Sequence, residues 1–113
     1  MAVIPNFDRA VIARQKLSDY LLNPAHKVGS PKLRFLESFG FSRDRPDEVS
    51  EALLAHGRAN PATVKTTPFG LRYEVDGPFQ TPSSAAPLVR TVWQEHERGA
   101  SLRFVTMVPR VSR

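Results

Sequence analysis

The chain has 113 residues and a mass of 12.6 kDa, which is the size of one small domain and excludes an enzyme built from two. It has no cysteine, so disulfide scaffolds, thiolate zinc sites and thiol nucleophiles are excluded together. Sixteen Lys and Arg against eleven Asp and Glu give a net charge of +5, which favours a polyanionic partner, while 41% hydrophobic residues argue against wholesale disorder.

The positive charge is concentrated in the first part of the chain. Residues 1–45 hold eight Lys and Arg and four Asp and Glu, whereas residues 46–113 hold eight and seven. If nucleic acid binds, the first part should therefore supply most of the phosphate contacts. The N-terminal segment has no apolar core of signal-peptide length, and no apolar run approaches the roughly 20 residues that span a bilayer. We expect a cytoplasmic protein without a membrane segment.

Three helices are predicted before Asn60–Pro61, because apolar residues recur there at helical spacing. An Asn-Pro pair marks the end of the first helix, and a Ser-Pro pair marks the start of the second. A glycine marks the end of the second helix, and another marks the end of the third. The predicted helices cover about 14–22, from Ser30–Pro31 to Gly40, and from Asp44–Pro46 to Gly57.

Four strands are predicted after Ala62, where apolar residues alternate with polar ones. The connections are short and contain no helix, which indicates an antiparallel meander. The fold class is therefore α+β, as a single domain over 1–113 with a helical half of about 1–60 and a sheet half of about 61–113. The predicted strands are Thr63–Thr67, Leu71–Asp76, Leu88–Glu95 and Leu102–Val108.

The segment Asn23–Phe35 is the most informative for function. Its loop carries His26 and leads into a helix whose first turn carries Lys32. Free backbone N–H groups at a helix start favour an anion, and an imidazole beside a bound phosphate can move a proton during RNA transesterification. The alternative is that His26 is a solvated loop residue and the lysines form an ordinary polar surface. The residues predicted to bind RNA phosphate are Lys27, Gly29, Ser30 and Arg34.

Arg90 lies near the middle of a predicted strand and shares its face with Leu88 and Val92. An unpaired guanidinium among apolar groups is costly. Arg90 therefore needs either a ligand, in which case it would stabilise a phosphoryl transition state, or an internal ion pair with Asp76 or Glu74.

Thr106 and Tyr73 also lie near the middle of predicted strands. By alternation Thr106 shares the face of Phe104, from which its hydroxyl could bond a phosphate. The alternative is a threonine that merely suits a strand. Trp93 is expected in the core.

The other two histidines are assigned no catalytic role. His56 follows the apolar stripe of the third helix, at the end where the helix dipole favours an imidazolium, so it is expected to cap the helix. His96 lies in a charged turn between Glu95 and Glu97, which lack a convincing third oxygen ligand for a metal. We expect neither a metal nor a cofactor.

Four segments of the chain together resemble a known group of proteins. They read KLSDYLLNPAHKVGSPKLRFLESFGF, TPFGLRYEVDGPFQTP, PLVRTVWQEHERG and LRFVTMVP. They are similar to a family of small, uncharacterised bacterial toxin-associated domains, whose layout is similar to that of the barnase, EndoU, colicin and RelE group of metal-independent ribonucleases. The family motifs fall on His26, Gly29, Lys32, Gly70, Tyr73, Gly77–Pro78, Arg90–Trp93, Thr106 and Pro109.

This resemblance implies a toxin of a toxin–antitoxin or polymorphic-toxin system that cleaves cellular RNA. His26 would be the general base or acid, Lys32 and Arg90 would neutralise the phosphoryl group, and Tyr73 and Thr106 would orient it. The implied partners are RNA and a small acidic antitoxin or immunity protein. The alternative is a non-catalytic basic module that binds RNA or such an acidic partner without turnover.

Overall fold

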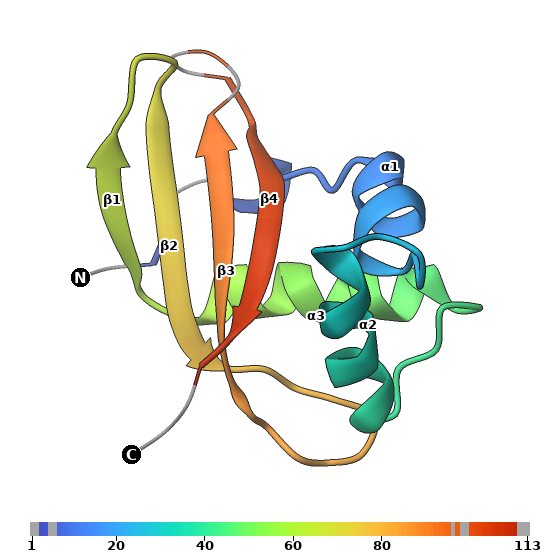
Figure 1. The fold of residues 1–113 in the computed structure, drawn as a ribbon. Coiled ribbons are helices and arrows are strands. Elements are labelled where there is room, and N and C mark those ends of the chain that lie inside the picture. The colour runs from blue at the N-terminus through green and yellow to red at the C-terminus, as the bar shows by residue number, and fades with distance from the viewer. Residues whose placement is uncertain (1–2, 5–6, 96, 98–99, 111–113) are drawn as a thin grey trace.

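The computed structural model describes residues 3–4, 7–95, 97 and 100–110. The helical part precedes the strands along the chain (Figure 1). It consists of the 3₁₀ turn η1 (Phe7–Arg9), α1 (Arg14–Lys16), the π-helical turn η2 (Leu17–Leu21), α2 (Gly29–Ser38) and α3 (Pro46–Ala59). The strands are β1 (Ala62–Thr66), β2 (Leu71–Pro78), β3 (Leu88–Glu95) and β4 (Leu102–Pro109).

The four strands form one antiparallel sheet in the order β1-β2-β3-β4. Helix α3 crosses one face of this sheet, and α1, η2 and α2 lie beside its β4 edge (Figure 1). The face turned away from α3 is called the open face, and its central positions are the paired residues Glu74, Val92 and Thr106 and, in the next row, Asp76 and Arg90. The predicted α+β class is confirmed, as are the strand order and the approximate helix positions.

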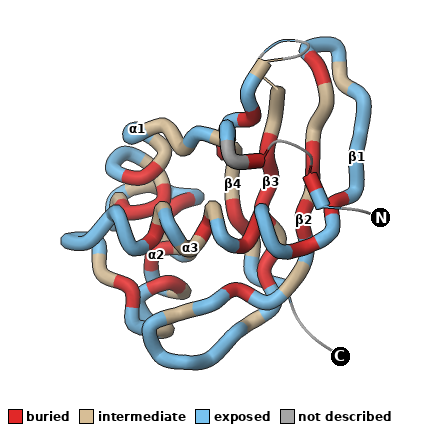
Figure 2. Tube along the Cα trace, turned by 180° about the vertical axis from the view of Figure 1, so that it is seen from behind, coloured by how far each residue is buried: buried red, intermediate tan, exposed pale blue. Residues whose placement is uncertain are grey.

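The core lies between the helices and the covered face of the sheet. Trp93 is fully buried there, with ring centroids 4.8 Å from Phe7 and 5.4 Å from Phe104, both in edge-to-face contact. Seen from behind, buried segments line the side of the sheet on which α3 rests (Figure 2). Phe7 thereby ties η1 to the same core as the strands.

The prediction that the third helix ends at Gly57 is wrong, because α3 continues to Ala59. Gly57 is buried inside the last turn, where a β-carbon would overlap the ring of Phe7. Glycine is therefore needed here because η1 and α3 approach closely, and it does not mark the helix end.

A β-bulge in the β3–β4 pairing determines which face Thr106 occupies. Trp93 pairs with Phe104, but the preceding residue Val92 pairs with Thr106, so Val105 is the extra residue. Phe104 and Met107 both point into the core, at 2% and 0% exposure. The predicted alternation, in which Thr106 shares the face of Phe104, is therefore wrong, and Thr106 lies on the open face instead.

Candidate functional site

The site combines four side chains, from η2, the loop after it, α2 and β4, called here the Tyr20 cluster: Tyr20, His26, Lys32 and Thr106. The Tyr20 hydroxyl lies 2.7 Å from the Thr106 Oγ1, and the Lys32 Nζ donates to the same oxygen at 2.9 Å. These bonds join η2, α2 and β4 at the junction of the helical part with the open face. Of the five residues predicted to be catalytic, the structure brings Lys32 and Thr106 into contact and places His26 against the Tyr20 ring. The other two, Arg90 and Tyr73, take no part in these contacts.

Tyr20 organises the positive charge of the cluster. The Nζ atoms of Lys16 and Lys32 lie 5.3 and 5.7 Å from the centroid of its ring, within the range of cation–π attraction. No acidic side chain takes part in the hydrogen bonds of the cluster among the residues that the structure describes. Two ammonium groups beside one phenol make this junction a suitable place for an anion.

Tyr20 was not predicted as a site residue, although it lies within the first predicted helix of about 14–22. Leu17 and Leu21 are buried in the π-helical turn, whereas Tyr20 of the same turn is half-buried. A hydroxyl-bearing aromatic residue six positions before a loop histidine was the available signal.

His26 is held by its own backbone environment. Its Nδ1 accepts hydrogen bonds from the N–H groups of Val28 and Gly29 at 3.1 and 3.0 Å, and its ring meets Tyr20 edge to face at 5.0 Å. A nitrogen that accepts two such bonds carries no proton, so the proton of the neutral ring lies on Nε2. The neutral His26 ring therefore offers its Nε2–H as a hydrogen-bond donor in this conformation.

The start of α2 differs from the predicted anion site. The helix begins at Gly29, with Val28 as its N-cap, and the N–H of Ser30 donates to the His26 carbonyl at 2.9 Å. The first backbone donors are thus satisfied by His26, and Ser30 is not the N-cap. Lys27 is exposed.

Gly29 is needed for packing at this point. A β-carbon there would overlap the backbone carbonyl of Tyr20, which belongs to η2. Any larger residue would push α2 away from η2 and separate Lys32 from Tyr20. Arg34, also predicted to bind phosphate, is exposed one turn further along α2.

Arg90 lies on the open face and is paired with carboxylates. Its Nε and one Nη donate to the two Asp76 oxygens at 2.8 and 2.9 Å, and its other Nη lies 3.4 Å from Glu74. The Arg90 hydrogen bond is the main cause that lowers the pKa of Asp76, and the same bond raises the pKa of Arg90. The predicted alternative, an ion pair with Asp76 or Glu74, is what the structure shows.

Tyr73 does not join the Tyr20 cluster. It pairs with Trp93, is 9% exposed and packs in the core, on the covered face of the sheet. The structure therefore separates it from Thr106, and a role for Tyr73 in orienting a phosphate conflicts with this placement.

His56 is buried, at 3% exposure, and binds the sheet instead of capping its helix by charge. Its Nδ1 lies 2.9 Å from the Thr91 hydroxyl, and its Nε2 lies 2.9 and 3.1 Å from the carbonyls of Val89 and Gly77. Desolvation by burial lowers the pKa of His56 below its usual value. The expected imidazolium is replaced by a neutral ring that ties α3 to β2 and β3.

His96 lies outside the described residues. Among those described, no group of three or more His, Asp or Glu side chains is placed to hold a metal ion, and no helix is both long and apolar enough to cross a membrane.

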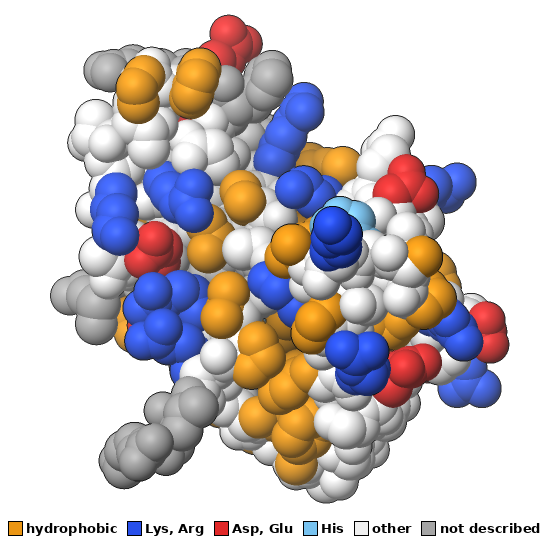
Figure 3. Space-filling view, in the orientation of Figure 1, with side chains coloured by type: hydrophobic (Ala, Val, Ile, Leu, Met, Phe, Trp, Pro, Cys, Tyr) orange, Lys and Arg blue, Asp and Glu red, His pale blue; other side chains and the backbone are white. Residues whose placement is uncertain are grey.

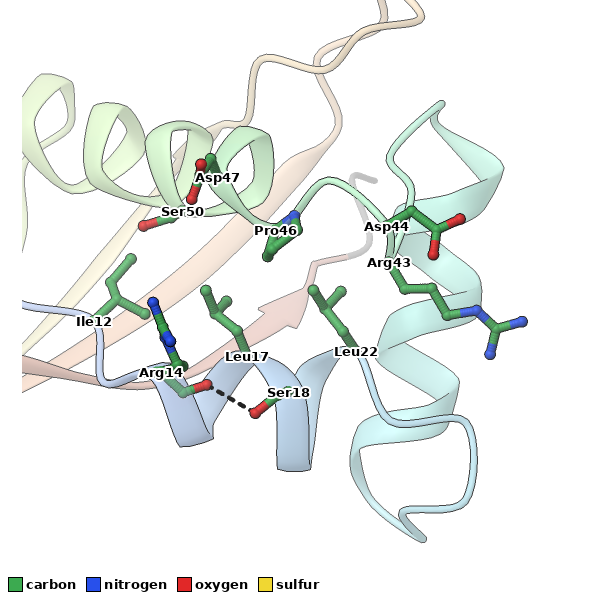
Figure 4. A pocket seen from close by; sticks show the side chains of 10 residues that line it. All are labelled: Ile12, Arg14, Leu17, Ser18, Leu22, Arg43, Asp44, Pro46, Asp47 and Ser50. Atoms are coloured by element: carbon green, nitrogen blue, oxygen red, sulfur yellow. Dashed lines mark hydrogen bonds between the residues drawn. The ribbon is translucent and has the colours of Figure 1, made fainter.

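A cavity of about 560 Å³ opens between η2 and the start of α3 (Figure 4). Ile12, Leu17 and Leu22 supply its apolar wall. Its charged lining is balanced, with two arginines and two aspartates: Arg14, Arg43, Asp44 and Asp47. None of the Tyr20 cluster lines this cavity, which is therefore separate from the candidate site.

Comparison with known proteins places the chain in a family and shows a related fold. The sequence model of a family described as a domain of unknown function, DUF6883, matches residues 3–111. No curated protein sequence matches significantly. The fold is similar to a chain in the solved "Contact-dependent growth inhibition toxin - immunity protein complex from Klebsiella pneumoniae 342", with a TM-score of 0.71 and 18% identity over 94% of this chain and 97% of that one.

Proposed function

Starting from the fact that this chain belongs to the DUF6883 family, we propose that it is a toxin of a bacterial toxin–antitoxin or polymorphic-toxin system. It acts in the cytoplasm as a metal-independent ribonuclease on cellular RNA. The observation that carries the proposal is the Tyr20 cluster, in which the Tyr20 phenol and the Lys32 ammonium both hydrogen-bond to the Thr106 hydroxyl oxygen. A fold shared with a chain of a growth-inhibition toxin–immunity complex supports the toxin assignment.

The cluster supplies the groups that RNA transesterification needs. Lys32 and Lys16 offset the charge that builds on the phosphoryl oxygens, and the Thr106 hydroxyl and the His26 Nε2–H hold those oxygens in place. Because His26 has no free lone pair in this conformation, it is a positioning group here instead of the base.

Proton transfer then falls to Tyr20. The 2′-oxygen forms a bond to phosphorus while the bond from phosphorus to the 5′-oxygen breaks, leaving a 2′,3′-cyclic phosphate. The Tyr20 phenol protonates the departing 5′-oxygen, and the proton released by the 2′-hydroxyl passes to solvent, from which the phenol is restored. The neighbouring ammonium groups stabilise the transient phenolate.

The second candidate function is a non-catalytic basic module that binds RNA or an acidic antitoxin or immunity protein. One observation favours it: the Nδ1 of His26, the residue predicted to be the base or acid, is already engaged by the backbone N–H groups of Val28 and Gly29. Lys and Arg side chains gather on the open face and on the helical part beside it (Figure 3), which suits an acidic partner for either function.

Expression without a partner separates the two functions. We expect the wild-type chain to arrest bacterial growth and Thr106→Val to relieve the arrest, because valine keeps the shape of threonine but lacks the shared hydroxyl. Thr66→Val, on the exposed strand β1, is the matched control and should remain toxic. The measurement is the growth rate after induction, at matched protein levels. A wild-type chain that accumulates without slowing growth contradicts the ribonuclease proposal and supports the binding module.

A further inference from the structure

We propose that Arg90 forms a second phosphate subsite next to the Tyr20 cluster, and that Asp76 and Glu74 restrain it. This inference rests on the proposed function, and it names the substrate class more closely. The substrate is an RNA strand with at least one phosphate beyond the one that is cleaved. The two carboxylates hold the affinity of this subsite for phosphate below what the free guanidinium would give.

The sheet register places the two sites side by side. Val92 pairs with Thr106, and Arg90, two residues before Val92, pairs with Val108. Arg90 and Thr106 are therefore diagonal neighbours on the open face, with α-carbons about 7–8 Å apart in regular antiparallel pairing. Long side chains cover such a separation easily, and neighbouring phosphates of one RNA strand are close enough to reach both positions.

The pairing of Arg90 leaves it available to a phosphate. Its side chain is 29% exposed and that of Asp76 is 51% exposed, so water and a dissolved phosphate can reach the ion pair. Asp76 uses only two of the five N–H donors of the guanidinium. A phosphate can thus bind the donors that Asp76 leaves free, or compete with Asp76 for the other two.

The cations of the open face exceed its carboxylates. Glu74 is 14% exposed and lies within 3.2 to 3.8 Å of the charged nitrogens of Lys65, Arg72 and Arg90, while Asp76 forms its ion pair with Arg90. Three cations therefore share two anions. Neutralising Asp76 leaves the structure of this network in place and removes the charge that repels a phosphate at Arg90.

The test measures binding of a single-stranded 2′-O-methyl RNA, which resists transesterification, to Asp76→Asn and to a matched control. Glu51→Gln is the control, because it removes the same charge from an exposed position on α3, across the sheet from Arg90. We expect Asp76→Asn to tighten binding by roughly three- to tenfold at low salt and to steepen the salt dependence by about one phosphate contact. Glu51→Gln should change both quantities much less.

Further arms identify the ligand and the residue. The tighter RNA binding of Asp76→Asn should disappear in the double variant Asp76→Asn/Arg90→Ala. It should also disappear when the ligand is a dinucleotide with a single phosphate. Glu74→Gln should change RNA affinity in the same direction as Asp76→Asn. Equal effects of Asp76→Asn and Glu51→Gln overturn the subsite while leaving the proposed function intact. A gain of the same size for polyglutamate also overturns it, because the site would then serve an acidic protein. Failure of the wild-type chain to bind RNA overturns both proposals.

Discussion

Replacing Lys32 with methionine is expected to lower the rate of RNA cleavage by roughly 10²- to 10³-fold, the usual loss when one electrostatic contact to a transition state is removed. Methionine keeps an unbranched apolar stem of similar length, so the packing of α2 against η2 is retained. What is lost is the ammonium that donates to the Thr106 Oγ1 at 2.9 Å and lies over the Tyr20 ring. Single-turnover cleavage of an end-labelled RNA measures the effect.

The control for this prediction is Arg58→Met, which removes one positive charge from an exposed position in the last turn of α3. It lowers the net charge equally but lies away from the Tyr20 cluster. We expect it to reduce cleavage only through weaker long-range attraction of RNA, which added salt screens. Equal losses in Lys32→Met and Arg58→Met, with both proteins folded, would contradict the role of Lys32.

The second large effect is on stability. We expect His56→Ala to lower the free energy of unfolding by about 2–4 kcal/mol, because it opens a cavity and leaves buried polar groups without partners. The Thr91 hydroxyl and the carbonyls of Val89 and Gly77 would all lose the ring that they contact. Thr91 also accepts from the Trp93 indole at 2.9 Å, so the loss reaches the centre of the core. Urea denaturation at pH 7.5 measures it.

The same histidine predicts how stability depends on pH. Burial lowers the pKa of His56 in the folded chain below its usual value of 6.5, so the unfolded chain binds this proton first as the pH falls. The stabilisation is complete above pH 6.5 and declines from there down to the lowered pKa of the folded state. In His56→Gln this slope should be reduced. An unchanged slope in that variant would show that the ring does not titrate as its burial requires.

The helices and strands could be read from the sequence because each depends on local spacing. The strand Leu88–Glu95 and its two faces were predicted correctly, because successive side chains of any strand point to opposite faces. The end of α3 was not predicted correctly. Gly57 is required by its contact with Phe7, some fifty residues away in the chain, and does not end the helix. A glycine that admits a distant ring and a glycine that ends a helix look the same in the sequence.

The candidate site was predicted in part, for a related reason. His26, Gly29 and Lys32 lie in one short segment, so their common environment could be inferred from it. The face of Thr106 depends on a bulge that arises only when β4 pairs with β3, and strict alternation gave the wrong answer. Tyr73 was predicted near the middle of a strand, as found, but its position in the core opposite Trp93 depends on the pairing of β2 with β3.

Arg90 shows what alternation can and cannot decide. Its face was predicted correctly, and the need for either a carboxylate or a ligand followed from its charge. The choice between the two depended on Asp76, which pairs with Arg90 across β2 and β3. Cross-strand register, which the sequence does not state, settled the partner.

The most direct test of the account is to identify the ends that the purified chain leaves on a labelled single-stranded RNA in the presence of EDTA. We expect cleavage that leaves 2′,3′-cyclic phosphate ends. This cleavage should be abolished when the 2′-hydroxyl at the cleaved position is replaced by hydrogen. Intact RNA at every protein concentration, or fragments that end in a 3′-hydroxyl, would contradict the assignment of transesterification to Tyr20, Lys32 and Thr106.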